Sequence, residues 1–248
     1  MQHGRDFPWR RDPTPYRVVV SEIMLQQTQV GRVERYFADW MRIFPDFETL
    51  AASPTENVLR AWQGMGYNRR ALWLRAIAKT VQADWGGELP RDPAVLKLLP
   101  GVGTNTAGSI AAFAFQVPAV FIETNIRRVY LHEFFPDSDS VLDRELLPLI
   151  EATMDKANPR KWYWALMDYG AYLGRQVPNP NRRSAHYTRQ GAFVGSTREL
   201  RGRVVAMLLV GPRSESDMMI DDARLGEVLG ALCREGFARY SDGRYSIA

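Results

Sequence analysis

The stretch Leu98-Leu-Pro-Gly-Val-Gly-Thr-Asn-Thr-Ala-Gly108 decides how this chain is expected to fold. Gly101 and Gly103 permit a tight turn that exposes consecutive backbone N–H groups, and Thr104 then begins a helix whose N-terminus adds a positive dipole. Backbone donors and a helix dipole together can hold a phosphate without any lysine. A bare Gly-x-Gly is most often a plain turn, so the meaning of this stretch depends on what flanks it.

Amphipathic helices are predicted on both sides of this turn. A short pattern begins at Asp92-Pro-Ala and ends at Leu99, and the next covers residues 104–115. Two short helices joined by Leu-Pro-Gly-Val-Gly form the helix-hairpin-helix pattern, which contacts the DNA backbone. We therefore expect DNA contacts from the residues of this turn: Gly101, Gly103, Thr104, Asn105 and Thr106.

Most of the remaining chain also has helical periodicity. One long amphipathic helix is predicted from Val19 to a point before Pro45, and another from Arg70 to Trp85, where Gly86-Gly87 stops it. Strands do not alternate with helices, which argues against a doubly wound sheet, so the chain is predicted to be mainly α. Further helices are predicted to begin at Asn125, Asp143, Pro159 and Ser184.

The pattern changes after about Arg198. Two short helical patterns, Leu200–Leu209 and Leu225–Cys233, precede two alternating runs joined by Ser241-Asp-Gly, a strong hairpin signal. This order is that of a small winged-helix-like module. We expect a first domain over 1–195, with a six-helix lobe at about 20–130 and a second lobe from 1–19 and 131–195, followed by the module at 196–248.

Composition excludes several classes of protein. The chain is 46% apolar and 24% charged, and its apolar runs fall far short of the ~20 residues that a membrane span needs. The start carries no apolar secretory segment. The single cysteine, Cys233, excludes a disulfide framework, Cys-ligated zinc and iron–sulfur clusters. We expect a cytoplasmic protein, nucleoid-associated in a bacterium, with no membrane partner and no metal.

Arginines are concentrated in one segment. Residues 171–213 contain eight arginines, Arg189 among them, and one acidic residue, although the whole chain has a net charge of only +4. The guanidinium fork binds phosphate oxygens in pairs, which suits DNA. The alternative is a solvated surface or a domain junction. Arg182 and Arg183 are the predicted phosphate contacts.

Two glutamates are the candidate catalytic groups. Glu22 precedes the apolar Ile23-Met24-Leu25, where loss of solvent would raise its pKa toward that of a general acid. Glu123 follows an apolar run at the start of a helix, whose dipole favours the ionised carboxylate. Each taken alone is more often a structural residue. One protonated and one ionised carboxylate together form the pair that cleaves glycosidic bonds.

Six motifs in order resemble the helix-hairpin-helix DNA glycosylase superfamily, most closely its MutY-type adenine DNA glycosylases. They extend from about Phe7 to Ala171, and the sequence motifs are Pro8-Trp-Arg, Thr14-Pro-Tyr, Ser21-Glu-x-Met-Leu-Gln-Gln-Thr-Gln, Gly64-x-Gly-Tyr67, Leu99-Pro-Gly-Val-Gly and Ala165-Leu-Met-Asp-x-Gly-Ala171. The resemblance implies a two-lobed, mainly α fold. It also implies double-stranded DNA with a mispaired or damaged base as the partner of a monomeric enzyme.

The resemblance assigns roles position by position. Glu22 matches the acid that protonates the purine at N7, and Glu123 falls where the family has an aspartate that stabilises the sugar cation. Asn125 matches an asparagine two residues later. Asn105 falls where relatives that also cut the strand carry a Schiff-base lysine, so no lyase activity is expected. Substrate and DNA contacts are further implied for Trp9, Arg10, Gln26 and Trp164, and wedging into the duplex for Gln27 and Tyr67.

The sequence departs from the family at four places. Gly174 stands at the first position of the missing iron–sulfur ligands, so no cofactor is expected. Glu123 is one methylene longer than aspartate, and Trp164 stands where the family has a Glu or Gln that hydrogen-bonds adenine. The domain that reads 8-oxoguanine is replaced by the module at 196–248.

The leading hypothesis is a monofunctional DNA N-glycosylase that flips a base out of the duplex and hydrolyses its glycosidic bond, with adenine from a mispair as the first expectation. Hypoxanthine, mispaired thymine or uracil, or an alkylated purine are alternative substrates. A DNA-binding protein on a glycosylase scaffold, with weak or lost catalysis, is the alternative of another class.

Overall fold

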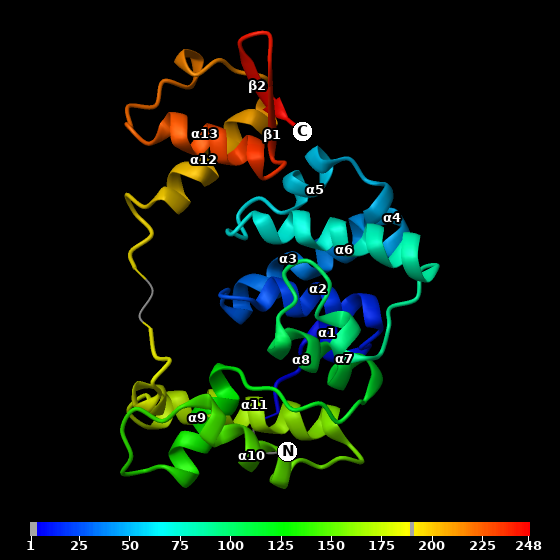
Figure 1. The fold of residues 1–248 in the computed structure, drawn as a ribbon, viewed down its shortest axis with the longest axis vertical. Coiled ribbons are helices and arrows are strands. Elements are labelled where there is room, and N and C mark those ends of the chain that lie inside the picture. The colour runs from blue at the N-terminus through cyan, green and yellow to red at the C-terminus, as the bar shows by residue number, and fades with distance from the viewer. Residues whose placement is uncertain (1–3, 189–190) are drawn as a thin grey trace. The chain divides into compact units, whose positions relative to one another are not determined.

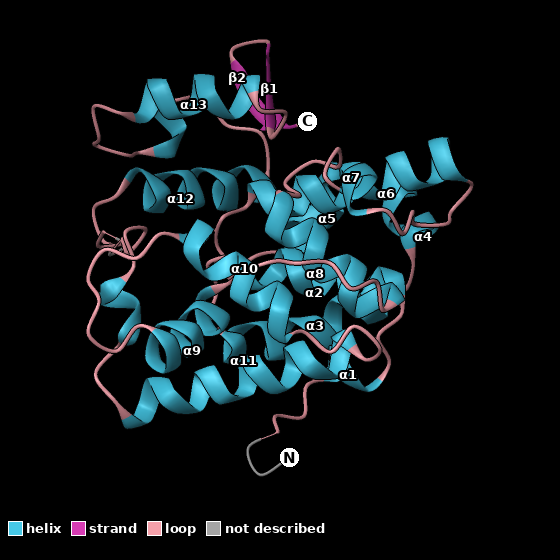
Figure 2. Ribbon diagram, turned by 60° about the horizontal axis from the view of Figure 1, so that its bottom comes forward, coloured by secondary structure: helices cyan, strands magenta, loops and turns pink. Residues whose placement is uncertain are grey.

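A computed structural model of the chain describes residues 4–188 and 191–248 (Figure 1). Contacts divide it into two units. The first unit comprises Met1–Ile23 and Leu89–Arg189, and the second comprises Met24–Glu88 and Gln190–Ala248. Helices dominate both, and Figure 2 shows strands only in one terminal hairpin, so the predicted mainly α class is confirmed.

The first unit is built from helices joined by short loops, with two helices, α9 and α11, packed along each other. Its elements are α1 (Pro8–Arg11), most of α2 (Pro15–Leu25), α7 (Pro93–Leu96), α8 (Thr104–Phe115), α9 (Thr124–Phe134), α10 (Asp143–Thr153), α11 (Pro159–Gln176) and a 3-10 helix (Pro180–Arg183).

An aromatic cluster forms the core of the first unit next to its candidate site. The Phe121 ring stacks on Tyr163 with centroids 4.0 Å apart, and Phe113 meets Phe121 edge-on at 5.8 Å. The buried Tyr163 hydroxyl donates to the carbonyl oxygen of Ala119 over 2.9 Å. These contacts hold the irregular segment 116–122, which leads directly into Glu123.

The second unit contains the remaining helices and the hairpin. Its elements are α3 (Val30–Ile43), α4 (Phe47–Ala52), α5 (Thr55–Ala61), α6 (Arg69–Trp85), α12 (Thr197–Val210), a 3-10 helix (Ser216–Met218), α13 (Leu225–Arg234), β1 (Ala238–Ser241) and β2 (Arg244–Ile247). Trp40 and Trp62 meet edge-on in its core, with centroids 5.4 Å apart.

The prediction of one long helix from Val19 is wrong, because this segment forms two helices, α2 and α3. Gln27 in the intervening turn has a left-handed φ of 52°. The buried Arg70 donates to the carbonyl oxygens of Met24 and Gln26 over 2.7 and 2.6 Å. This side chain stabilises a turn that helical periodicity alone does not reveal.

The C-terminal elements are confirmed, and one other predicted helix is wrong. β1 and β2 pair antiparallel from Ser241↔Arg244 outward, and the turn residues Asp242 and Gly243 both have positive φ. Ser184, however, begins no helix in the part of the chain that is described. It forms a parallel bridge with Val141, since its segment pairs with the chain before α10.

The domain boundary predicted near Gly195 stays a prediction. Contacts place the chain from Gln190 onward in the same unit as Met24–Glu88. Within the described ranges, no helix is both long and apolar enough to cross a membrane.

Candidate active site

Glu22 is an enclosed carboxyl group on α2. It keeps a small part of its surface accessible. Burial, together with the nearby charge of Glu123, raises the pKa of Glu22 to about 7 against the opposing effects of the Ser109 hydrogen bond and the Arg10 charge. A carboxyl group with this pKa is still protonated in a large fraction of molecules at neutral pH, as a general acid must be.

Ser109 on α8 is the direct partner of Glu22. Its hydroxyl donates to Glu22 Oε2 over 2.5 Å and also lies 3.0 Å from the carbonyl oxygen of Thr106. Ser109 is only 2% exposed. The sequence analysis missed this residue, although a single hydroxyl within the apolar run 107–113 is a detectable signal.

Glu123 is the N-cap of α9. Its Oε1 accepts hydrogen bonds from the backbone N–H groups of Asn125 and Ile126 over 2.9 and 3.0 Å. Burial raises the pKa of Glu123, and these bonds oppose that rise. Because an N–H group can only donate, these two bonds favour the ionised form of Glu123 and act against the effect of burial.

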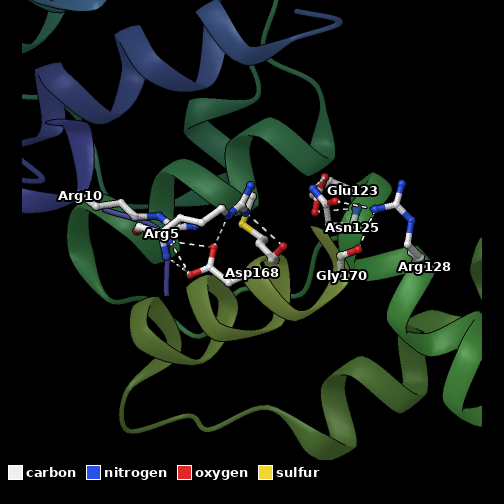
Figure 3. A network of polar contacts seen from close by, with 8 residues as sticks. Arg5, Arg10, Glu123, Asn125, Arg128, Asp168 and Gly170 are labelled. Carbon is white, nitrogen blue, oxygen red and sulfur yellow. Dashed lines mark hydrogen bonds and ion pairs between the residues drawn. The ribbon is translucent and has the colours of Figure 1, made fainter. Parts of the chain in front are cut away.

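Asn125 links Glu123 to a neighbouring arginine (Figure 3). The Asn125 amide nitrogen donates to Glu123 Oε2 over 3.3 Å, and its oxygen accepts from Arg128 over 3.0 Å. Arg128 also donates to the Gly170 carbonyl on α11 over 2.7 Å. Arg128 therefore fixes which end of the Asn125 amide faces Glu123.

Gly170 allows α9 and α11 to approach closely at this point. A Cβ atom on Gly170 would lie 2.2 Å from the carbonyl oxygen of Asn125. Position 170 in the motif that ends at Ala171 is therefore a glycine because the backbone of Asn125 occupies the space that a side chain would need.

Arg10 acts on the site from the interior of the first unit. Its guanidinium binds both oxygens of Asp168 over 3.0 and 2.8 Å, and Arg5 binds the same carboxylate (Figure 3). Asp168 is 4% exposed, and the Arg10 side chain is 9% exposed. Arg10, for which the family resemblance implies a substrate or DNA contact, forms a largely buried ion pair here, and its positive charge lowers the pKa of Glu22.

The predicted contacts at Trp9 and Trp164 differ in exposure. Trp9 is 6% exposed and stacks on Phe7 with centroids 4.9 Å apart, so it is a core residue. Trp164 on α11 remains partly exposed, with the Arg10 guanidinium 5.3 Å from its ring centroid. Of the two indoles, Trp164 is the one available to a substrate.

The turn before α8 has the conformation expected of an anion site. Gly101 has φ +73°, and Gly103 caps α8 with nothing within 4 Å of where a Cβ would lie. Thr104 is exposed and Thr106 partly so. Asn105 is exposed, and its side-chain oxygen accepts from the Ile122 N–H over 3.2 Å, which connects this turn to the segment before Glu123.

Gln26, Gln27 and Tyr67 lie in two loops of the second unit. Tyr67 has a left-handed φ of 51°, like Gln27. One buried side chain joins the loops, because Arg70 also donates to the Gly66 carbonyl over 2.9 Å and to the Thr28 hydroxyl over 2.9 Å. Arg70 is a second residue that the sequence analysis missed.

Arg182 and Arg183 have different surroundings. Arg182 is exposed. Arg183 donates to the carbonyl oxygens of Phe135, over 2.9 Å, and Pro136, so its guanidinium is used to close the C-terminal end of α9. Only Arg182 of the predicted pair suits a phosphate contact, and Arg189 lies outside the described residues.

Gly174, near the C-terminal end of α11, does not fit the first cysteine of an iron–sulfur cluster. A Cβ at Gly174 would lie 2.6 Å from Arg128 Nη1, so a cysteine there would displace that guanidinium. The only cysteine of the chain is Cys233 on α13. No cluster of metal-ligating side chains occurs among residues 4–188 and 191–248.

Known proteins are similar to this chain over most of its length. The profile of the HhH-GPD superfamily base excision DNA repair proteins matches residues 20–151. The adenine DNA glycosylase of Mycolicibacterium smegmatis is 31% identical, covering 98% of this chain and 92% of that protein. The human adenine DNA glycosylase is 38% identical, covering 68% of this chain and 33% of that protein.

Solved structures show the same fold. A thermostable thymine-DNA glycosylase is 28% identical with a TM-score of 0.59, covering 67% of this chain and 78% of that one. Endonuclease III in a DNA complex is 22% identical with a TM-score of 0.55, covering 65% of this chain and 74% of that one.

Proposed function

The chain belongs to the HhH-GPD superfamily of base excision DNA repair proteins and is a DNA N-glycosylase, and we propose that it removes adenine from mispairs without cutting the DNA strand. The observation that carries the proposal is the pair Glu22 and Glu123, two enclosed carboxyl groups with unlike partners.

Glu22 supplies the proton in this mechanism. With a pKa of about 7 it gives a proton to N7 of the flipped purine, so that the base leaves as a neutral molecule when the C1′–N9 bond breaks and the electron pair passes to the base. The bond from Ser109 holds the carboxyl group in one orientation.

Glu123 stabilises the positive charge that develops on the sugar. The cap bonds from the Asn125 and Ile126 N–H groups fix the carboxylate, and the amide of Asn125 fixes its other oxygen. An anion held in this way requires no rearrangement when the oxocarbenium-like transition state forms. Water then adds to C1′ and loses a proton, leaving an abasic site.

The proposal excludes strand cleavage and needs no cluster. The position of the Schiff-base lysine is taken by Asn105, whose side chain binds the Ile122 N–H instead. The absence of three further cysteines and the Arg128 guanidinium against Gly174 support a glycosylase that works without an iron–sulfur cluster.

DNA is the partner of this chain. The turn before α8 supports binding of a duplex phosphate, and the names of the relatives support adenine as the base. Indole can donate one hydrogen bond but cannot accept one, so Trp164 cannot replace the paired hydrogen bonds of the family's Glu or Gln. We therefore propose that Trp164 stacks on the base. We place the activity in the cytoplasm or nucleoid, because the enzyme must have access to the duplex DNA of the chromosome. We also propose that the enzyme acts as a monomer.

The test is excision from a panel of duplexes. Each carries one target: adenine opposite guanine or 8-oxoguanine, hypoxanthine, thymine or uracil opposite guanine, or an alkylated purine, and alkali then reveals abasic sites. We expect cleavage of the adenine mispairs after alkali and none without it. Release of thymine or uracil alone would replace adenine with the runner-up substrate, and specific binding without any excision would support the scaffold alternative.

Glu22→Gln is the matched control variant. Glutamine keeps the shape but cannot deliver a proton, and general acid catalysis contributes about 10²–10⁴-fold. We expect excision to fall by that factor while duplex affinity changes little. Single-turnover rates within a few fold of the unaltered protein would remove Glu22 from the mechanism.

A further inference from the structure

Tyr67 is held by two arginines of the second unit. Its hydroxyl accepts a hydrogen bond from Arg198 Nη1 over 2.7 Å. The Arg198 and Arg70 guanidinium carbons lie 5.7 and 5.4 Å from the centre of its ring. The residue is nevertheless 36% exposed, so it remains accessible to a DNA duplex.

The backbone that carries Tyr67 is fixed independently of Arg198. The Gly66 carbonyl accepts from the Trp62 indole over 3.0 Å and from Arg70 over 2.9 Å. A Cβ at Gly64, which has φ +86°, would lie 2.0 Å from the Tyr36 hydroxyl. The path of the loop is thus determined, and what remains to be fixed is the direction of the Tyr67 side chain.

Arg198 stands at an unusual place for a cation. It lies in the first turn of α12, where the helix dipole disfavours positive charge. The helix already has a cap, because the Ser196 hydroxyl accepts from the Glu199 N–H. Arg198 therefore does not stabilise the helix end. Its second nitrogen donates to the Gly191 and Ala192 carbonyls over 2.9 and 3.3 Å, which aims the first at Tyr67.

The C-terminal segment also contacts the helix that directly follows this loop. Glu235, which follows α13, binds both Arg201 of α12 and Arg69 of α6, the latter over 2.5 Å. Arg69 is two residues after Tyr67. These two ion pairs join α12 and the residue after α13 to the first residue of α6, next to the loop that bears Tyr67.

From these contacts we propose that Arg198 is a positioning residue for Tyr67, through which residues 197–235 take part in distorting DNA. The inference rests on the proposed function and on the role that the family resemblance implies for Tyr67, which is to wedge into the duplex as the base is flipped out. Arg198 holds the phenol ring ready for insertion and reduces the number of orientations it must lose on binding.

The test is a double-mutant cycle with Arg198→Ala and Tyr67→Phe. Excision is measured in single turnovers on a duplex and on the same target placed opposite an abasic site, where no pairing has to be broken. We expect Arg198→Ala to slow duplex excision about tenfold, the loss of one charge-assisted hydrogen bond, and to slow the second substrate little. Tyr67→Phe should then add almost nothing in the Arg198→Ala background.

Two variants control for charge and chemistry. Arg203→Ala removes an exposed arginine from the same helix and should leave both rates unchanged. Arg198→Lys keeps the charge but cannot donate to Tyr67 and to the Gly191 carbonyl at the same time as a guanidinium does. It should therefore recover only part of the excision rate that Arg198→Ala loses. Circular dichroism melting of each variant verifies folding.

A second readout keeps the inference separate from the proposed function. In the Glu22→Gln background, the fluorescence of 2-aminopurine beside the target reports unstacking without excision, and Arg198→Ala should reduce its increase on binding. Equal loss on both excision substrates, or additive effects in the cycle, would overturn the role of Arg198. Absence of excision by the unaltered protein, with 2-aminopurine unstacking retained, would overturn only the proposed activity.

Discussion

The Ser109 hydroxyl donates to Glu22 Oε2 over 2.5 Å, from a residue 87 positions farther along the chain. This bond favours the ionised carboxyl group, while burial favours the protonated one and prevails, so that the pKa of Glu22 is about 7. The balance leaves the acid both protonated and able to release its proton near neutral pH.

The pH dependence of excision should report this balance. The rate should fall as pH rises through about 7, because Glu22 must be protonated to act. Ser109→Ala removes a contact that lowers the pKa, so the falling limb should move to higher pH. Single-turnover rates between pH 5 and 9 measure both profiles. A limb that stays in place, or moves to lower pH, would contradict the role of Ser109.

Glu22 should also reduce the stability of the protein at alkaline pH. Its pKa is 4.5 in an unfolded chain and about 7 when folded, so its effect on stability is absent below pH 4.5, grows as pH rises from 4.5 to 7 and is constant above that. Glu22→Gln cannot ionise. We expect it to melt at a similar temperature to the unaltered protein at pH 4, and at pH 8.5 to be more stable by on the order of 3 kcal/mol. Thermal melts at the two pH values test this.

Glu123 should act through its charge. Glu123→Gln keeps the shape of the cap and loses the charge, so excision should fall at least about a hundredfold. Glu123→Asp keeps the charge at a different distance from the sugar and still caps α9, so it should retain part of the activity. Single-turnover rates on each excised substrate decide the matter. A Glu123→Asp variant several times faster than the unaltered protein on all of them would show that Glu123 is a degraded site.

The two adjacent arginines should have separable effects. Arg182→Ala should weaken binding to undamaged duplex and reduce the slope of log K against log salt by about one phosphate equivalent. Arg183→Ala should leave the slope nearly unchanged and lower the melting temperature, because its guanidinium binds the Phe135 and Pro136 carbonyls. Titrations at several salt concentrations measure the slopes. The reverse pattern would show that Arg183 is the phosphate contact.

The sequence by itself determined the elements whose signals are local. The helix from Thr104 to Phe115 has the predicted bounds, since Gly103 and the apolar spacing mark its start and course. The hairpin at Asp242-Gly243 follows from turn chemistry, and the enclosed positions of Glu22 and Glu123 agree with the apolar runs beside them. Each of these depends on neighbours within about one helical turn.

Only the tertiary structure decided what depends on distant partners. Arg70 stabilises the turn that interrupts the helix predicted from Val19, because it donates to carbonyl groups more than forty residues away. The spacing of apolar residues in the sequence does not indicate such a contact. Arg10 pairs with Asp168 across 158 positions, and neither its own sequence surroundings nor the DNA contact implied by the family resemblance indicates this partner. Burial and partnership set the role of a charged side chain, and both arise only when remote segments pack together.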